Sequence, residues 1–143
     1  MYNLSDIKDI HLEVTSKCQA RCPMCPRRVN GGVQNPLITI EEIDLDTFKK
    51  WFPETFIKQL NSLFMCGNLG DPIIAKDCLE IFEYLRTVNP NIHLSMHTNG
   101  SARDTKWWER LAFLNVRTVF GIDGLEDTHH LYRIDTDWHK IIK

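Results

Sequence analysis

The sequence lacks the features that would place the protein in a membrane, outside the cell or on a nucleic acid. No apolar run approaches the length that spans a bilayer. The first ten residues, MYNLSDIKDI, have neither the basic flank nor the apolar core of a signal peptide. The formal net charge of −2 leaves no basic excess for nucleic-acid binding. We therefore expect a cytoplasmic protein that binds neither membranes nor nucleic acid.

Internal repeats, low-complexity tracts and Gly/Ser linkers are absent as well. The length of 143 residues is that of one domain with a core of its own. A hydrophobic content of 43% and a charged content of 25% are ordinary for a globular protein. We therefore expect one domain over residues 1–143.

Strand-like and helix-like segments alternate along this domain. Strands are predicted at IHLEV (10–14), NSLFMCG (61–67), NIHLSMHTNG (91–100, with a turn at its last two residues) and VRTVFGIDG (116–124). Helices are predicted at DLDTFKKWF (44–52), which Pro53 ends, at DCLEIFEYLRTV (77–88), at DTKWWERLAFL (104–114) with Asp104 as N-cap, and at WHKIIK (138–143). The alternation favours an α/β fold with parallel strands and right-handed crossovers, in an open sheet or in part of a barrel.

Each predicted strand is followed at once by an unusual loop. The loops are CQARCPMC (18–25), GNLGDP (67–72), HTNG (97–100) and GIDG (121–124). In parallel α/β folds, the loops at the carboxyl ends of the strands lie on one face, where active sites are built. We expect these four motifs to meet on that face.

Three of the five cysteines, Cys18, Cys22 and Cys25, lie in the first of these loops. Cysteines at this spacing in a reducing compartment are typical of metal ligands rather than disulfides. Thiolates bind iron and zinc, and so tight a loop can surround one small cluster. Cys66 near the end of a strand and Cys78 on the apolar stripe of a helix are expected to be buried structural residues. The ligand set is then one short, which leaves the open position that a catalytic metal needs.

The spacing of CQARCPMC resembles the signature of the radical S-adenosylmethionine (radical SAM) superfamily. The resemblance implies a 4Fe-4S cluster on Cys18, Cys22 and Cys25, with one free iron that chelates the amino and carboxylate groups of S-adenosyl-L-methionine. Reductive cleavage of this cofactor would give methionine and a 5′-deoxyadenosyl radical, which takes a hydrogen atom from the substrate. The family fold is a partial (β/α)6, TIM-like barrel with the helices outside. This chain would supply its N-terminal four βα units.

The other loops add to the resemblance. GNLGDP is similar to the Gly-Gly-Glu-Pro-type motif whose backbone binds the cofactor amino group, and HTNG is similar to the family's Thr-Asn-Gly. FGIDGLEDTHHLYR (120–133) resembles the stretch found in members with a C-terminal auxiliary-cluster (SPASM/twitch-type) region, in which a serine and a downstream arginine contact the cofactor carboxylate. The residues implied to bind the cofactor are Gly67, Asn68, Leu69, Gly70, Asp71, Thr98, Asn99 and Arg133.

These residue types suit that role. Glycine lets main chain approach a ligand closely, a carbonyl or carboxylate accepts from an ammonium group, and an arginine fork matches a carboxylate. Two positions depart from the family pattern. Gly121 stands where many relatives have the serine, so the role of that hydroxyl falls to backbone or to Arg133. Met24 stands where an aromatic is frequent; methionine can still pack against adenine, so this is treated as variation.

Four strands do not close a six-unit partial barrel, and the sequence stops within an early turn of a helix. We expect a fragment of a longer reading frame; the alternative is a half-barrel whose edge strand needs a partner. Substrate contacts would come from later strands and C-terminal extensions, so the substrate, peptide or small molecule, stays unnamed. The resemblance also implies an electron donor that is flavodoxin- or ferredoxin-like.

Two other functions stay open. A structural or electron-transfer module that holds zinc or an iron–sulfur cluster would complete its ligand set with a fourth residue such as Cys66. An inactive fragment would bind the cofactor poorly. Outside the motifs, His129 and His130 are expected at the solvated surface. Arg27 and Arg28 either neutralise an anionic site or are solvated.

Overall fold

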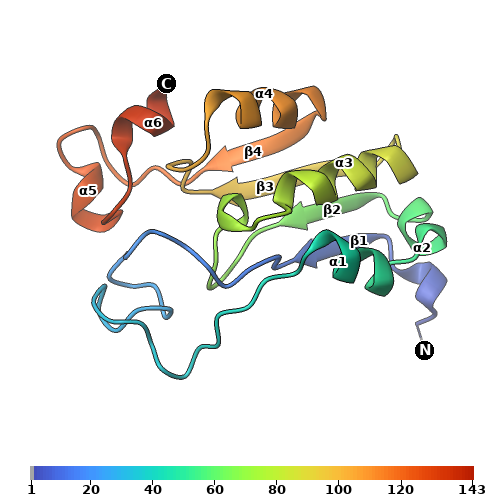
Figure 1. The fold of residues 1–143 in the computed structure, drawn as a ribbon, viewed down its shortest axis with the longest axis horizontal. Helices are drawn as coiled ribbons and strands as arrows, with labels where there is room; N and C mark the ends of the chain where they lie inside the picture. The colour runs from blue at the N-terminus through green and yellow to red at the C-terminus, as the bar shows by residue number, and fades with distance from the viewer. Residues whose placement is uncertain (1) are drawn as a thin grey trace.

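The computed structural model describes residues 2–143 and contains four parallel strands in one sheet. The strands are β1 (Asp9–Leu12), β2 (Ser62–Met65), β3 (His93–Thr98) and β4 (Val116–Phe120), and they lie in the order β1-β2-β3-β4. Their arrows point the same way in Figure 1, so all four carboxyl ends lie at one edge of the sheet. The predicted α/β fold with parallel strands is confirmed.

Four helices lie in the connections between the strands, and two more follow β4. They are α1 (Leu45–Trp51), α2 (Glu54–Lys58), α3 (Cys78–Val88), α4 (Thr105–Phe113), α5 (His129–Tyr132) and α6 (Trp138–Ile142). The predicted N-cap of α4 is confirmed, because the Asp104 carboxylate accepts a hydrogen bond from Trp107 N at 2.9 Å. No helix among residues 2–143 has both the length and the apolar character that a bilayer crossing demands.

Helix α2 has no counterpart in the sequence predictions. Pro53 ends α1, as the sequence predicts, but it also occupies the N-cap of α2. Proline is tolerated at the start of a helix because the first N–H groups have no partner there in any case. Phe56 and Ile57 of this short helix are buried in the core, which stabilises a turn that would be marginal alone.

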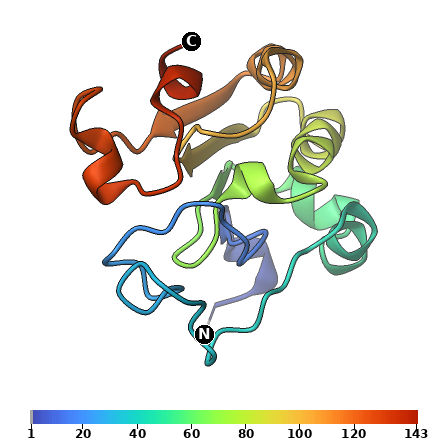
Figure 2. The same ribbon diagram turned by 60° about the vertical axis from the view of Figure 1, so that its left-hand side comes forward.

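The core lies between the sheet and helices α1 to α4, which cover one face of it (Figure 2). Leu63 and Met65 of β2 point to this side, and so do Leu94 and Met96 of β3, because alternate residues of a strand share a face. Cys78 is fully buried beneath them, as predicted, with its sulfur 3.8 Å from that of Met65.

Candidate functional site

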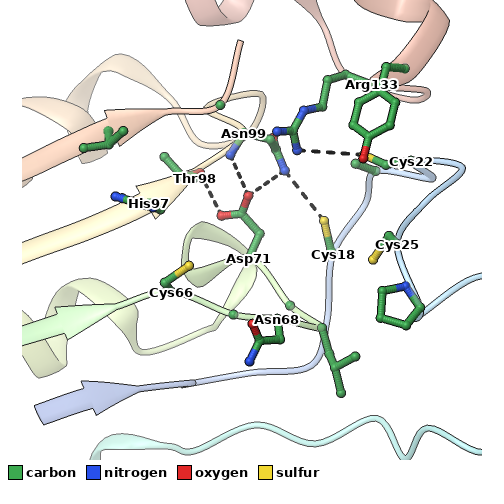
Figure 3. Close-up of a pocket in the computed structure, with 18 residues that line it drawn as sticks. Cys18, Cys22, Cys25, Cys66, Asn68, Asp71, His97, Thr98, Asn99 and Arg133 are labelled. Atoms are coloured by element: carbon green, nitrogen blue, oxygen red, sulfur yellow. Dashed lines mark hydrogen bonds between the residues drawn. The ribbon is translucent and has the colours of Figure 1, made fainter. Parts of the chain in front are cut away.

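A cavity of about 340 Å³ lies where the loops after the four strands meet (Figure 3). All the residues that the sequence predicts for the site border this cavity: Cys18, Cys22, Cys25, residues 67–71, Thr98, Asn99 and Arg133. The four motifs therefore share one face, as their positions after parallel strands predict. Cys66, His97 and Gly121 border the same cavity, although the sequence predicts none of them as a cofactor-binding residue.

The cysteine loop, residues 18–25, forms one wall of the cavity. It is shaped by tight turns, in which Cys25 N donates to Cys22 O at 3.0 Å and Arg28 N donates to Cys25 O at 3.0 Å. All three thiols are free, and Figure 3 shows their side chains across the cavity from Cys66.

The donor set of this wall fits a multinuclear cluster better than a single ion. Within residues 2–143, no three His, Cys, Asp or Glu side chains converge closely enough to hold one metal ion. The three thiols stand around a cavity instead, and thiolates are the usual ligands of iron–sulfur clusters. A cluster spreads its ligands over several iron atoms, so its thiolates do not have to meet at one point.

Burial changes the acidity of these thiols. It raises the pKa of Cys18 to about 11, and the neighbouring Asp71 carboxylate adds to that rise. Burial also raises the pKa of Cys22, while the positive charge of Arg133 acts in the opposite direction. Because a metal binds the thiolate form, ligation by these two residues must release protons.

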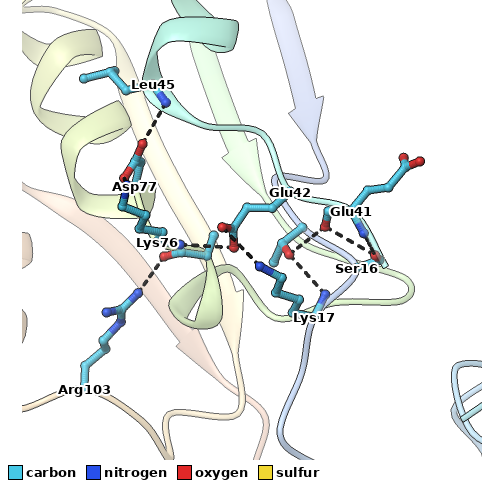
Figure 4. Close-up of polar contacts among 10 residues, drawn as sticks. Ser16, Lys17, Glu41, Glu42, Leu45, Lys76, Asp77 and Arg103 are labelled. Atoms are coloured by element: carbon cyan, nitrogen blue, oxygen red, sulfur yellow. Dashed lines mark hydrogen bonds and ion pairs between the residues drawn. The ribbon is translucent and has the colours of Figure 1, made fainter. Parts of the chain in front are cut away.

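A strap formed by residues 38–44 holds the entrance of the cysteine loop (Figure 4). The Ser16 hydroxyl donates to Thr39 O at 2.9 Å, and Lys17 forms an ion pair with Glu42 at 3.3 Å. The strap leads directly into α1, so the start of the cysteine loop is attached to the helical layer as well as to β1.

Asp71 is the buried centre of the opposite wall. Its carboxylate accepts hydrogen bonds from the Thr98 hydroxyl at 2.7 Å, from Asn99 N at 2.7 Å, from Asn99 Nδ2 at 2.6 Å and from Ile73 N at 3.2 Å. Burial raises the pKa of Asp71, and these donors oppose the rise. A carboxylate has about four acceptor positions. The donors therefore use the whole group, which joins the loops after β2 and β3 and leaves no position for the ammonium group of a ligand.

Asn99 extends this network across the cavity to the cysteine loop. Its Nδ2 lies 3.7 Å from Cys18 Sγ, and Gln19 Nε2 donates to its Oδ1 at 2.7 Å. Gln19 is a contact that the sequence does not reveal, since the cysteine spacing says nothing of the residues between the thiols. The two walls are therefore connected through side-chain amides.

The glycine-rich run, residues 67–70, lies against other main chain. A Cβ on Gly70 would lie 1.8 Å from Thr15 O, and one on Gly67 would lie 2.5 Å from Gly70 O. Only glycine fits at both positions. Among the described residues, 2–143, no hydrogen bond reaches the main-chain carbonyls of this run, so they are available to a ligand.

Glu13 fixes the orientation of that run. Its carboxylate accepts from Asn68 N at 3.2 Å and from Asn68 Nδ2 at 2.7 Å. The sequence pattern predicts only a strand over IHLEV (10–14), and strand alternation does not show which loop lies beside Glu13.

Arg133 reaches the cavity from the segment that follows β4. Its Nε donates to the Asp123 carboxylate, and its Nη1 lies 3.8 Å from Cys22 Sγ. The same segment is joined to β3, because Gly121 N donates to Thr98 O at 2.8 Å. Arg133 therefore stands between the cysteine loop and the end of β4.

The segment after β4 also contacts the cysteine loop directly. Arg21 N donates to Ile134 O at 2.9 Å, and the Arg21 guanidinium forms an ion pair with Asp135. These contacts hold the segment after β4 against the cysteine loop.

Burial of several side chains differs from the sequence predictions. His129 is only 1% exposed, because its ring packs against Trp138 and its Nδ1 accepts from Asp123 N at 3.3 Å; the prediction of a solvated residue is wrong there. Arg27 is 2% exposed and donates to the Ala20 carbonyl, so it is not solvated either.

Two further residues, Cys66 and Met24, differ in their relation to the cavity. Cys66 is half-buried at the cavity rather than closed in the core. Met24 is 80% exposed and lies outside the cavity lining.

Comparison with known proteins agrees with the motifs. The Radical SAM superfamily matches residues 12–143, a span that contains all four loops. The chain belongs to this superfamily. Its four βα units are accordingly part of a partial, TIM-like barrel, which settles the choice between an open sheet and a barrel.

Individual relatives match over part of their length. The FeMo cofactor biosynthesis protein NifB of Methanocaldococcus infernus is 28% identical over 119 residues, which is 77% of this chain and 37% of NifB. The crystal structure of BtrN in complex with AdoMet and 2-DOIA has a TM-score of 0.65 at 17% identity and covers 96% of this chain and 55% of BtrN.

Native anSMEcpe with bound AdoMet has a TM-score of 0.71 at 22% identity, and covers 94% of this chain and 38% of anSMEcpe. The two solved structures show that the fold is shared. The chain spans between about a third and about half of the length of these three proteins.

Proposed function

We propose that this chain is the core of a radical SAM enzyme, in which Cys18, Cys22 and Cys25 hold a 4Fe-4S cluster and the adjoining cavity binds S-adenosyl-L-methionine. The observation that carries the proposal is the meeting of three free thiols and three cofactor-type loops around one cavity. When bound, the reduced cluster supplies the electron that cleaves the cofactor and so generates the radical that abstracts hydrogen.

The main chain of residues 67–70 is suited to the amino group of the cofactor. Its carbonyls carry no hydrogen bond among residues 2–143, and its glycines let a ligand come close. Asp71 acts indirectly in this proposal, since its carboxylate is already saturated by Thr98, Asn99 and Ile73. It is a positioning residue that keeps Asn99 beside Cys18.

An external reductant must deliver the electron, and we propose a flavodoxin- or ferredoxin-like donor. The substrate, peptide or small molecule, is unassigned, because the cavity described above is already assigned to cluster and cofactor. NifB, BtrN and anSMEcpe are longer than this chain, and nothing in their names is carried over to its substrate.

Anaerobic reconstitution with iron and sulfide tests the proposal. We expect about four irons per chain. Addition of S-adenosyl-L-methionine with dithionite should then release 5′-deoxyadenosine, detected by chromatography and mass spectrometry. A chain that holds its cluster, binds the cofactor and releases no 5′-deoxyadenosine under reduction would contradict the proposed chemistry.

Cys66 motivates a second candidate, a structural or electron-transfer module with four thiolate ligands. Its thiol is half-buried and borders the same cavity as the other three. The matched variants Cys22→Ser and Cys66→Ser separate the two functions. The enzyme proposal expects iron to be lost from the first variant and kept by the second. Equal loss from both would favour the module, because the position reserved for the cofactor would already be filled.

A further inference from the structure

We propose that the buried guanidinium of Arg27 is the counter-charge of the iron–sulfur cluster, and that it favours the reduced state of that cluster without contacting the cofactor. The inference rests on the proposed function, because it requires a cluster on Cys18, Cys22 and Cys25. It concerns how readily the site accepts an electron from its external donor, rather than how S-adenosyl-L-methionine is bound.

Arg27 is the only buried lysine or arginine in the part of the chain that the structure describes. It is 2% exposed, although the adjacent Pro26 is exposed and the last cysteine of the cysteine loop is only two residues away. A charged group is rarely removed from water to this extent unless an opposite charge lies beside it. The burial of Arg27 therefore calls for an anion nearby.

The chain provides no such anion within residues 2–143. The arginines that form ion pairs there are Arg21, Arg110 and Arg133. The Arg27 side chain donates one hydrogen bond, from Nη2 to the Ala20 carbonyl, and its buried Nε has no acceptor among the same residues. The loop therefore holds this charge in place but does not neutralise it.

The guanidinium lies behind the cysteine loop rather than in the cavity. Ala20 and Pro26 border the cavity, whereas Arg27 does not. Burial raises the pKa of Cys18, and the positive charge of Arg27 opposes that rise, so its field reaches the first of the three thiols. Arg27 is thus placed to act on the ligands by charge alone, without touching a molecule bound in the cavity.

Electrostatics gives the direction of the effect. A 4Fe-4S core on three thiolates has a net negative charge, and one electron from the donor makes that charge more negative. A buried cation stabilises the more negative state more strongly, because water and salt screen a buried charge only weakly. The positive charge of Arg27 should therefore raise the reduction potential of the cluster, and its removal should lower it.

Neutralisation of this charge tests the inference. The proteins are the reconstituted wild type, Arg27→Gln, Arg27→Lys and Arg28→Gln, and the measurement is an anaerobic redox titration followed by electron paramagnetic resonance, without S-adenosyl-L-methionine. We expect Arg27→Gln to lower the equilibrium constant for reduction about tenfold or more, and tenfold corresponds to about 59 mV for one electron. Arg27→Lys keeps the charge and should stay within about threefold of the wild type.

Arg28→Gln is the matched control, because it removes the same charge from the next residue. Arg28 is only half-buried, and its charge acts on the exposed Asp135, whose pKa is lowered first by the hydrogen bond from Arg21 and further by Arg28. Its loss should change the equilibrium constant for reduction by less than about threefold. Equal effects of Arg27→Gln and Arg28→Gln would mean that any nearby charge serves, and the assignment to Arg27 would be wrong.

Two further measurements separate the charge of Arg27 from its hydrogen bond to Ala20: the iron content, and the urea midpoint of the metal-free chain. Arg27→Met, which keeps an apolar stem in the buried position, replaces Arg27→Gln if the latter does not fold. If the folded neutral variants hold no cluster, Arg27→Lys decides. A lysine variant that keeps about four irons supports the need for a charge. A lysine variant that also loses them would assign Arg27 to the shape of the loop and overturn the inference.

The remaining failures are distinct. A wild-type chain that assembles no iron–sulfur cluster contradicts the proposed function itself. If the wild type carries about four irons and Arg27→Gln has an unchanged potential, the charge of Arg27 does not act on the cluster and only the inference is wrong. Equal shifts in Arg27→Gln and Arg27→Lys would assign the effect to the lost hydrogen bond rather than to the charge, and would also overturn the inference.

Discussion

On the side of β2 and β3, the cavity wall is held by the buried Asp71 carboxylate, with Gly70 against the main chain behind it. On the other side stand the free thiols of the cysteine loop, with Arg133 next to Cys22. We refer to these as the carboxylate side and the thiol side. On the first side the Asp71 carboxylate is satisfied within the chain, whereas the second side presents donors and ligands with few partners among residues 2–143. A site of this kind combines a preorganised wall with one that a bound group completes.

The largest effect is expected from Asp71→Ala. Removal of the carboxylate leaves the donors of Thr98, Asn99 and Ile73 unpaired in a buried place. The free energy of unfolding of the metal-free chain should fall by about 3–5 kcal/mol, measured by urea denaturation. The matched control is Asp104→Ala, which removes one exposed N-cap bond and should cost about 1 kcal/mol. Similar losses for the two variants would mean that the carboxylate side is not held by Asp71.

A smaller loss is expected from Gly70→Ala, at the edge of the same side. The added Cβ would meet Thr15 O at 1.8 Å, and because both groups are main chain the loop must shift. We expect a loss of about 2–3 kcal/mol in the free energy of unfolding. Gly32→Ala is the control, since its Cβ would lie 3.1 Å from Val29 O, and should cost less than about 1 kcal/mol. A Gly70→Ala chain as stable as the control would show that this loop is not closely packed.

The thiol side should contribute less to stability than to binding. Cys22→Ala removes one buried sulfur, so the metal-free chain should lose only about 1 kcal/mol. Its iron content after reconstitution should nevertheless fall from about four to nearly none. Both quantities are measured on one preparation, by denaturation and by iron assay. A stability loss as large as that of Asp71→Ala would erase the distinction between the two sides.

A last prediction concerns the pH dependence of stability. The folded chain raises the pKa of Cys18 from 9.0 to about 11, mainly through burial, so folding favours the neutral thiol. The contribution of the neutral Cys18 thiol to the free energy of unfolding is fully present below about pH 9, and it is lost as the pH rises through the pKa of the folded chain. Urea midpoints of the metal-free chain between pH 8 and pH 11 should show the decline, and Cys18→Ser should reduce it. An unchanged slope in the variant would assign the decline to other groups.

Patterns local to the chain predict much of the fold. Alternation in the strands, the apolar stripe that contains Cys78 and the cap at Asp104 all depend on near neighbours, and the structure confirms them. The loops that border the cavity follow from their positions after parallel strands. Pro53 is the local exception, because a residue that ends one helix can also begin the next.

Features of the site that depend on distant segments are not predictable in this way. His129 is buried by Trp138, and the role of Asp71 comes from Thr98 and Asn99, at and just after the end of the next strand. Gln19 and Glu13 acquire their partners only when loops from different strands meet. The motifs therefore identify which residues border the cavity, but not which of them are already occupied by one another.

The order of synthesis gives the anchoring of the cysteine loop a further consequence. The contact of Arg21 with Asp135 cannot form until the chain is 114 residues longer, and that of Gln19 with Asn99 until it is 80 residues longer. At roughly 5–20 residues per second on the ribosome, the thiols stay unsheltered for several seconds or longer after they emerge. Oxidants and stray metals have access to them during that interval, and we expect a cluster to be stable only after β4 and its loop have been completed.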